Sequence, residues 1–407
     1  MKRILMLTQW FDPELNMKGL SFARELRSLG YDIQVLTGFP NYPGGKVYPG
    51  YKIKLFQKDI MDGIPVFRVP LYPSHDQRAF GRFANYSSFA LAASLIGPFG
   101  IKRPDVIYAY HPPATVGLPA WLLSGLYRAP LVYDIQDLWP DTLTATGMVR
   151  SRLILSLVDQ WCRFIYARAA KIVVLSPGFK SKLIERGVPE AKIEVVYNWC
   201  DESRLGTVER DEALGRELGM ANRFNVLFPG TMGKAQALEA VLEAAALLRD
   251  KLPAVQFVLA GGGIEVTRLK AIKDEKGLAN VLFLPYRPID EMNRIFGLAD
   301  VLLVHLKNSP LFEITIPGKT QTCLAAGRPV LMGVKGNAAE LVEKARAGLI
   351  CRPQDPLEIA SAVESFYRMS PGQRDAMGRN GKDFYHRELS LERGVKRFDL
   401  IFKSVIS

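Results

Sequence analysis

Short apolar runs alternate along the whole chain with segments in which apolar residues recur at helical spacing. Continuous apolar strands that alternate with helices are typical of parallel sheets covered on both faces. In the first half, strands are predicted at 3–8, 32–37, 65–69, 105–110, 131–135 and 171–175. In the second half, they are predicted at 225–229, 255–260, 281–284, 300–304 and 329–332. Two such series in succession predict an α/β protein with two Rossmann-like, doubly wound domains.

The boundary between the two series is predicted at about residue 200. After a strand at 193–197, the apolar rhythm lapses and charged residues accumulate over 198–219. A chain of 407 residues also exceeds what one hydrophobic core organises. We therefore expect domains at 1–199 and 200–389. Because ligands bind beyond the carboxyl ends of parallel strands, two facing domains would create a cleft for the chemistry.

The charge of +12 is concentrated in the first half of the chain. Residues 1–200 hold 24 Lys and Arg against 15 Asp and Glu, whereas residues 201–407 hold 29 against 26. This half suits an anionic surface or substrate. The absence of a basic run or a recognised DNA- or RNA-binding motif argues against a nucleic-acid partner.

Neither the cysteines nor the histidines predict a metal site. The four cysteines lie far apart without a CxxC pair, and the four histidines are equally scattered. This spacing argues against a zinc site or a disulfide framework and favours a reducing, cytoplasmic compartment. The N-terminal apolar run is too short for a signal peptide.

The segment 83–101 is the one stretch that invites a membrane interpretation. It has no charged residue and is flanked by basic residues, but Asn85, three serines and Gly97-Pro98 make a membrane span unfavourable. A buried helix and an in-plane helix that touches the bilayer both remain open.

Three glycine-containing turns are candidates for phosphate binding. Residues 261–263 are three glycines between a strand and a helix, and 229–236 (PGTMGKAQ) places Lys234 after a glycine turn. The dinucleotide fingerprint fails at Val266, and the Walker-like PGKT at 317–320 lacks its first glycine, so ATP hydrolysis is not supported. Ordinary strand–helix turns would explain the glycines equally well.

The strand at 131–135 leads into three carboxylates, those of Asp134, Asp137 and Asp141. Asp134 is expected to cap a turn and Asp141 a following helix, whereas Asp137 leaves the strand end and is expected to point into the cleft. The loop 39–51 is rich in Pro, Gly and aromatic residues. Such a loop suits the face of a sugar ring, although a rigid surface loop is equally compatible.

Together these features resemble family 4 glycosyltransferases of the GT-B fold over essentially the whole chain. The resemblance rests on Gly19 after the first strand, DLWPD at 137–141, GTMGK at 230–234, LAGGG at 259–263 and IPGKTQTCLAAGRPV at 316–330. Within the family, the segments 8–20, 37–52 and 133–143 are most similar to bacterial L-fucosamine (N-acetyl-L-fucosaminyl) transferases, which build O-antigen or capsular polysaccharide.

The resemblance implies a retaining enzyme that holds a UDP-sugar in its C-terminal domain and an acceptor in its N-terminal domain. The last helix, at about 390–407, is expected to pack back on the N-terminal domain. Lys234 and Lys319 would offset the diphosphate charge in place of a metal, with no other cofactor. The implied donor-site residues are Gly19, Gly230, Lys234, Gly261, Gly262, Gly263, Pro285, Tyr286, Arg287, Ile316, Pro317, Gly318, Lys319 and Thr322. The implied acceptor-site residues are Tyr42, His111, Asp134 and Trp139.

Two positions depart from the family pattern. Gln136 stands where many relatives have a histidine, and its amide can bind a sugar hydroxyl but cannot take a proton. The family's pair of glutamates would fall at Ile314 and Thr322, so it is absent in register, and Glu313 is the nearest substitute. Asp137, Gln136 and Glu313 are therefore the catalytic candidates.

The acceptor is expected to be a saccharide on a polyprenyl diphosphate at the inner face of the cytoplasmic membrane. The basic first half, the segment 83–101 and the basic helix expected at 150–168 then share one explanation. Two alternatives remain open, a UDP-sugar 2-epimerase of the same fold and a non-catalytic UDP-sugar-binding subunit of an assembly complex.

Overall fold

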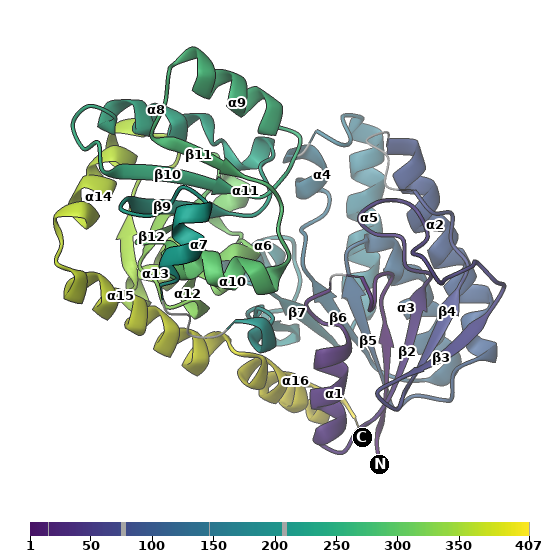
Figure 1. Cartoon of the computed structure of the whole chain (residues 1–407). Helices are drawn as coiled ribbons and strands as arrows, with labels where there is room; N and C mark the ends of the chain where they lie inside the picture. Colours follow the sequence, from purple (N-terminus) through teal and green to yellow (C-terminus); the bar gives the residue numbers. More distant parts are fainter. Residues whose placement is uncertain (15, 75–78, 146, 206–209, 407) are drawn as a thin grey trace. The chain divides into compact units, whose positions relative to one another are not determined.

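The computed structural model describes residues 1–14, 16–74, 79–145, 147–205 and 210–406, and the chain divides into two compact units (Figure 1). The first unit comprises Met1–Tyr197 and Gly394–Ser407, and the second comprises Asn198–Arg393. Residues 206–209, part of the charged stretch at the expected boundary, lie outside the described residues. The predicted fold class, two α/β units built on parallel sheets, is confirmed.

The first unit contains an eight-stranded sheet in the order β3-β4-β2-β1-β5-β6-β7-β8. Its strands are β1 (Arg3–Leu7), β2 (Asp32–Gly38), β3 (Gln57–Met61), β4 (Ile64–Val69), β5 (Val106–His111), β6 (Leu131–Ile135), β7 (Lys171–Val174) and β8 (Ile193–Val195). Its helices are α1 (Leu20–Ser28), α2 (Ala79–Leu95), α3 (Gly117–Tyr127), α4 (Asp141–Ala145), α5 (Arg152–Arg168), α6 (Pro177–Glu185) and α16 (Leu391–Val405). Short 3-10 turns are η1 (Gly97–Phe99), η2 (Ala114–Val116) and η3 (Glu190–Lys192).

The second unit contains a six-stranded, wholly parallel sheet in the order β11-β10-β9-β12-β13-β14. Its strands are β9 (Phe224–Pro229), β10 (Val255–Ala260), β11 (Val281–Leu284), β12 (Val301–His305), β13 (Val330–Gly333) and β14 (Gly348–Ile350). Its helices are α7 (Glu212–Glu217), α8 (Glu239–Leu248), α9 (Val266–Glu275), α10 (Ile289–Leu298), α11 (Pro310–Glu313), α12 (Gly318–Ala325), α13 (Asn337–Ala345), α14 (Pro356–Arg368) and α15 (Pro371–Phe384). Short turns are η4 (Glu202–Arg204), η5 (Lys234–Gln236) and the π-helical η6 (Tyr385–Leu389).

The strands predicted from apolar runs are present with ends within about one residue, because both faces of these strands are buried. Strands β5 and β10 are buried at every position. Two strands were missed. Strand β3 (QKDIM) is a polar edge strand, antiparallel to β4 and half exposed, so it shows no continuous apolar run. Strand β14 has only three residues.

The last helix, α16, packs on the first unit. The ring of Phe398 lies 5.0 Å from that of Phe22 in α1, and Tyr31 donates a hydrogen bond of 2.7 Å to Asp399. The uncharged segment 83–101 forms most of α2 and all of η1, with Phe89 buried and Phe99 91% exposed. Within the described part of the chain, no helix has the length and apolar character needed to cross a membrane.

Candidate functional site

The carboxyl end of β6 carries a buried polar network rather than an open carboxylate. Asp134 is fully buried, and its Oδ2 accepts hydrogen bonds of 2.6 Å from both Lys18 Nζ and Tyr108 OH. Gln136 Nε2 donates to Asp134 Oδ1 at 2.5 Å. The expected acceptor contact of Asp134 is therefore corrected: this carboxylate neutralises Lys18 and orients the amide of Gln136.

Asp137 follows this network and differs from it in having an available carboxylate. Its side chain is half-buried, and no described residue donates a hydrogen bond to it. Desolvation raises the pKa of Asp137 from 3.8 to about 6. Burial is the main cause of the raised pKa values of Tyr42 and Tyr86, and the charge of Asp137 adds to both, so these phenols lie within electrostatic range of its carboxylate.

The loop 39–51 presents part of this aromatic wall. The ring of Tyr42 packs 4.7 Å from that of Trp10, and Tyr86 meets Trp10 edge to face at 6.3 Å. Flat aromatic faces beside a carboxylate can hold a sugar ring through its apolar face and one hydroxyl. The acceptor contact of Tyr42 stays a prediction.

Glu14, which the sequence analysis overlooked, holds this loop in place. Its Oε1 accepts hydrogen bonds from the backbone N–H groups of Asn41 (2.6 Å) and Tyr42 (2.7 Å), and its Oε2 accepts one from Phe11 (3.2 Å). Burial raises the pKa of Glu14 to about 7, although the three backbone bonds oppose that shift. No local pattern identified Glu14, because its partners Asn41 and Tyr42 stand 27 and 28 positions away along the chain.

His111 and Trp139 are neighbours. The imidazole of His111 is buried, 5.8 Å from the rings of both Tyr133 and Trp139, and burial lowers its pKa to about 3. Its two ring nitrogens have no hydrogen-bond partner among the described residues. His111 was predicted to contact the acceptor, but the protein encloses its imidazole. Trp139, by contrast, is half-buried.

Gly19 stands directly before α1, as expected, but the helix end is already occupied by protein. Asp12 Oδ2 accepts a hydrogen bond of 2.7 Å from the N–H of Leu20, and a Cβ on Gly19 would lie 2.2 Å from that oxygen. The close approach that glycine permits here is therefore that of Asp12.

In the second unit, two glycine turns pack directly against each other at the carboxyl ends of β9 and β10. A Cβ on Gly261 would lie 2.1 Å from Gly230 O, and one on Gly263 would lie 2.3 Å from Met232 O. Gly261 and Gly263 also have φ values of +145° and +144°, which side chains rarely adopt. These glycines are thus required by backbone contact.

Lys319 and Thr320, at the start of α12, place two unsatisfied polar groups beside these turns. Lys319 Nζ and Thr320 Oγ1 are enclosed, and neither has a hydrogen-bond partner among the described residues. Lys319 Nζ lies 3.7 Å from the ring centroid of Phe228, and a Cβ on Gly230 would be 3.8 Å from it. Burial lowers the pKa of Lys319 to about 8. A cation, a hydroxyl and a helix N-terminus together suit a phosphate. Thr320 was missed, because only its enclosure distinguishes it.

A cavity of about 380 Å³ adjoins the glycine turn. Gly261, Gly262 and Gly263 form part of its wall, together with the predicted Pro285 and Tyr286. The remaining lining residues are Met232, Val266, Lys270, Phe283 and Leu284. The apolar lining next to backbone groups can accept a flat heterocycle.

The other predicted donor residues vary in accessibility. Lys234 is exposed at the start of η5, and Gly318 is exposed at the start of α12. Arg287 pairs with Glu291 at 2.8 Å, while its enclosed Nε has no partner among the described residues. The remaining three are Ile316, which is buried, Pro317, which is half-buried, and Thr322, whose hydroxyl bonds Gly318 O at 3.5 Å. Glu313 ends α11 and is half-buried.

Across the described ranges, no group of three or more His, Cys, Asp or Glu side chains is arranged to hold a metal ion. The four cysteines are all buried and free. Independence from metal remains a prediction.

Both units match known families. Residues 20–199 match the family described as a glycosyl transferase 4-like domain, and residues 223–369 match the one described as glycosyl transferases group 1.

Individual relatives match most of the chain. It is 26% identical to WcaI of Escherichia coli K12, named as a colanic acid biosynthesis glycosyl transferase, over 95% of this chain and 96% of that protein. It is 24% identical to the glycosyltransferase WbjE of Pseudomonas aeruginosa, over 72% and 74% of the two chains. In structure it is similar to Anabaena HepE solved with UDP-glucose, with a TM-score of 0.73, 18% identity and 99% of each chain covered.

Proposed function

This chain is a glycosyltransferase with the GT-B fold, and we propose that it transfers N-acetyl-L-fucosamine from a UDP-sugar to a lipid-linked saccharide. The product would be a bacterial surface polysaccharide. WcaI is named for colanic acid biosynthesis, which supports a role in polysaccharide synthesis, and HepE was solved with UDP-glucose, which supports UDP as the nucleotide. The choice of L-fucosamine rests on the sequence resemblance at 8–20, 37–52 and 133–143.

The unsatisfied ammonium of Lys319 carries the donor half of the proposal. An enclosed cation without a partner is unfavourable in the empty protein and becomes favourable when an anion arrives. Gly230 lies beside both Lys319 and Gly261, and Gly261 lines the 380 Å³ cavity. One UDP molecule can therefore reach from this cavity to Lys319. Uracil would occupy the cavity, and the diphosphate would meet Lys319 and Thr320.

The proposed chemistry requires no metal, because Lys319 stabilises the departing UDP. The bond from the anomeric carbon to the phosphate oxygen breaks, and the acceptor hydroxyl oxygen bonds to that carbon on the same face. The hydroxyl proton passes to the departing phosphate. Asp137 would accept a hydrogen bond from a sugar hydroxyl, with the aromatic wall of Trp10 and Tyr42 against the ring.

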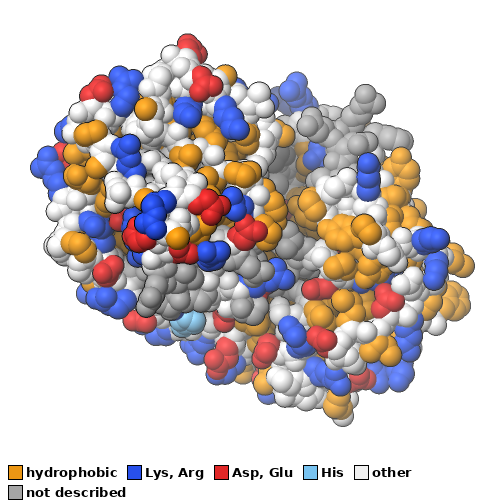
Figure 2. Space-filling view, in the orientation of Figure 1, with side chains coloured by type: hydrophobic (Ala, Val, Ile, Leu, Met, Phe, Trp, Pro, Cys, Tyr) orange, Lys and Arg blue, Asp and Glu red, His pale blue; other side chains and the backbone are white. Residues whose placement is uncertain are grey.

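Exposed apolar side chains on the first unit support docking to a bilayer that carries the acceptor. Helix α2 packs on α3, and α3 packs on α5. Their exposed apolar residues, with that of η1, are Phe83, Leu91, Leu95, Phe99, Leu122, Leu126, Leu153, Ile154 and Leu157. Figure 2 shows such side chains at the surface of this unit beside basic ones. A patch of this kind next to Arg150 and Arg152 suits an anionic membrane.

A panel of UDP-sugars tests the donor. UDP-N-acetyl-L-fucosamine is expected to raise the melting temperature more than UDP-glucose or UDP-N-acetylglucosamine, since a bound ligand stabilises by mass action. Transfer to a polyprenyl-diphosphate saccharide is then measured by the mass gained by the lipid. Binding with a changed donor epimer and no lipid product would indicate an epimerase, and UDP binding without turnover would indicate a binding subunit.

Sedimentation with vesicles tests the membrane contact. Binding to anionic vesicles is expected at low salt, with release at high salt, because exposed charges are screened over roughly 10 Å at 0.1 M ionic strength. Equal binding to neutral vesicles would contradict an electrostatic contribution.

A further inference from the structure

The segment 137–141, which carries Asp137, is fastened to the body of the first unit by Arg186. Arg186 Nη1 donates a hydrogen bond of 3.1 Å to the carbonyl of Trp139, and Nη2 pairs with the carboxylate of Asp141. The guanidinium is largely enclosed, with 12% of the Arg186 side chain exposed. One rigid, planar group therefore holds two points of the segment at once.

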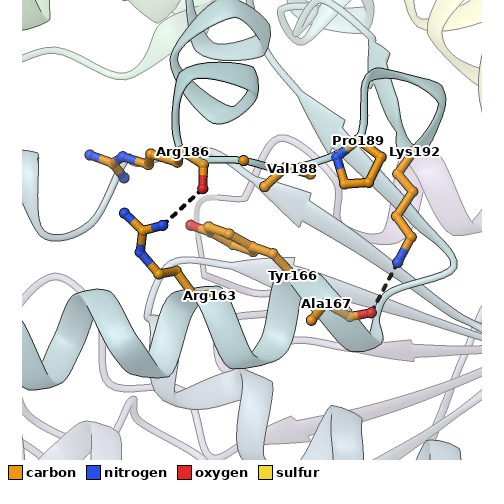
Figure 3. A pocket seen from close by; sticks show the side chains of 8 residues that line it. Arg163, Tyr166, Ala167, Arg186, Val188, Pro189 and Lys192 are labelled. Atoms are coloured by element: carbon orange, nitrogen blue, oxygen red, sulfur yellow. Dashed lines mark hydrogen bonds between the residues drawn. The ribbon is translucent and has the colours of Figure 1, made fainter.

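The backbone of Arg186 is in turn bonded to a side chain of helix α5. Its carbonyl accepts a hydrogen bond of 2.8 Å from Arg163 Nη1 on α5, and Arg163 Nε is paired with Asp159 at 2.7 Å. Figure 3 shows Arg186, Arg163 and Tyr166 among the residues that line a cavity, with the hydrogen bond from Arg163 to the carbonyl of Arg186. The cavity has a volume of about 320 Å³. Helix α5 thus anchors the backbone of Arg186.

Local structure alone does not fix the segment. Helix α4 has only five residues, too few to be stable by itself in water. Asp141 begins this helix, so Arg186 holds both the first residue of α4 and the carbonyl of Trp139, two residues before it. Without Arg186, the segment would keep its connection to β6, the buried side chain of Leu138, the ring contact of Trp139 with His111 and the Thr142 N–H bond of 2.8 Å to Leu138 O. Among the described residues, the polar side-chain contacts that the structure shows for Trp139 O and the Asp141 carboxylate come from Arg186.

We propose that Arg186 is a positioning residue for sugar transfer, which holds the 137–141 segment so that the Asp137 carboxylate stays fixed in its half-buried position. Arg186 touches no substrate. The inference rests on the proposed function, because it assumes that Asp137 contacts a sugar. A displacement of about 1 Å at a reacting group can lower a rate about a hundredfold.

Arg3 supplies a matched control. Arg3 Nε pairs with Asp32 at 2.5 Å and Nη1 bonds the carbonyl of Arg103 at 3.1 Å, so it also joins a carboxylate to a carbonyl. It lies at the amino end of β1, whereas Asp137 follows the carboxyl end of β6 in the same sheet. Arg186→Met and Arg3→Met therefore remove similar bonds at different ends of the strands.

The experiment compares transfer kinetics and amide hydrogen exchange in the two variants. Arg186→Met is expected to lower kcat by about ten- to a hundredfold, with donor KM changed by less than about twofold. The amides of residues 138, 139, 141 and 142 should exchange faster in this variant. The acid limb of its pH–rate profile should move to lower pH as water reaches Asp137. Arg3→Met should leave kcat and these amides unchanged. Arg186→Lys should recover only part of the rate, because one ammonium cannot form both bonds in a plane.

The outcomes separate this inference from the proposed function. If Arg186→Met has the hydrogen exchange and the kcat of the wild type while Asp137→Asn is inactive, the role of Arg186 is overturned. The proposed function then stays intact. A slow Arg186→Met with a fully active Asp137→Asn would overturn the route through Asp137. If the wild type transfers no sugar, the proposed function fails, and the exchange comparison still decides whether Arg186 holds the segment.

Discussion

Replacing Lys319 with Met should stabilise the empty protein while weakening its binding of UDP. Burial lowers the pKa of Lys319 from 10.5 to about 8. At pH 7 this shift corresponds to a destabilisation on the order of 3 kcal/mol, because the charged form loses hydration without gaining a partner. Contact of the ammonium with the Phe228 ring at 3.7 Å offsets part of it, by about 1–2 kcal/mol.

The expected gain for Lys319→Met is therefore about 1–2 kcal/mol, which corresponds to a rise in Tm of about 2–8 °C for a unit of this size. The loss of a charge-assisted contact with the diphosphate, about 1.5–3 kcal/mol, should weaken UDP binding by about ten- to a hundredfold. The lowered pKa of Lys319 also decides how this destabilisation changes with pH. The destabilisation is complete below pH 8, declines as pH rises from 8 to 10.5, and is absent above that range.

Differential scanning fluorimetry at pH 7 and at pH 10, with and without UDP, measures both effects. The Tm difference between variant and wild type should narrow at the higher pH, and wild-type affinity for UDP should fall above pH 8 as Lys319 loses its proton. Lys234→Met is the control, since the exposed Lys234 should show no gain in Tm. A Lys319→Met protein that is no more stable than wild type, or that binds UDP equally well, would refute the reasoning.

Three further predictions concern the rest of the site. Asp137→Asn should abolish transfer without loss of folding, and wild-type activity should decline as pH falls below about 6, where Asp137 takes up a proton; near-normal turnover would remove Asp137 from the mechanism. Lys18→Met or Asp134→Asn should each lower the free energy of unfolding by about 3–5 kcal/mol, since either leaves a buried polar group unpaired; urea titration would show this, and a loss below 1 kcal/mol would contradict it. Gly261→Ala should lose UDP affinity or fail to fold, because its Cβ would lie 2.1 Å from the carbonyl of Gly230; calorimetry with UDP measures this, and wild-type affinity would count against the close packing of the turns.

The candidate site could be predicted only in part. The glycine turns and Lys319 were recognisable because their spacing follows a family pattern. Glu14 and Thr320 were not, because one acid or hydroxyl among apolar residues gives no indication of what will enclose it. Asp134 and Asp137 illustrate the same limit: they stand three positions apart, yet Asp134 is enclosed by Lys18 and Asp137 remains available.

By itself, the sequence determined the two parallel α/β units, since strands buried on both faces must be apolar throughout and glycine must stand where backbones touch. Only the tertiary structure decided which charges are satisfied. That outcome depends on residues brought together from distant parts of the chain: Lys18 pairs with Asp134 and Arg186 with Asp141, whereas Lys319 meets the ring of Phe228 and has no hydrogen-bond partner among the described residues. Electrostatic free energy depends on distance and burial, and neither is encoded in local sequence.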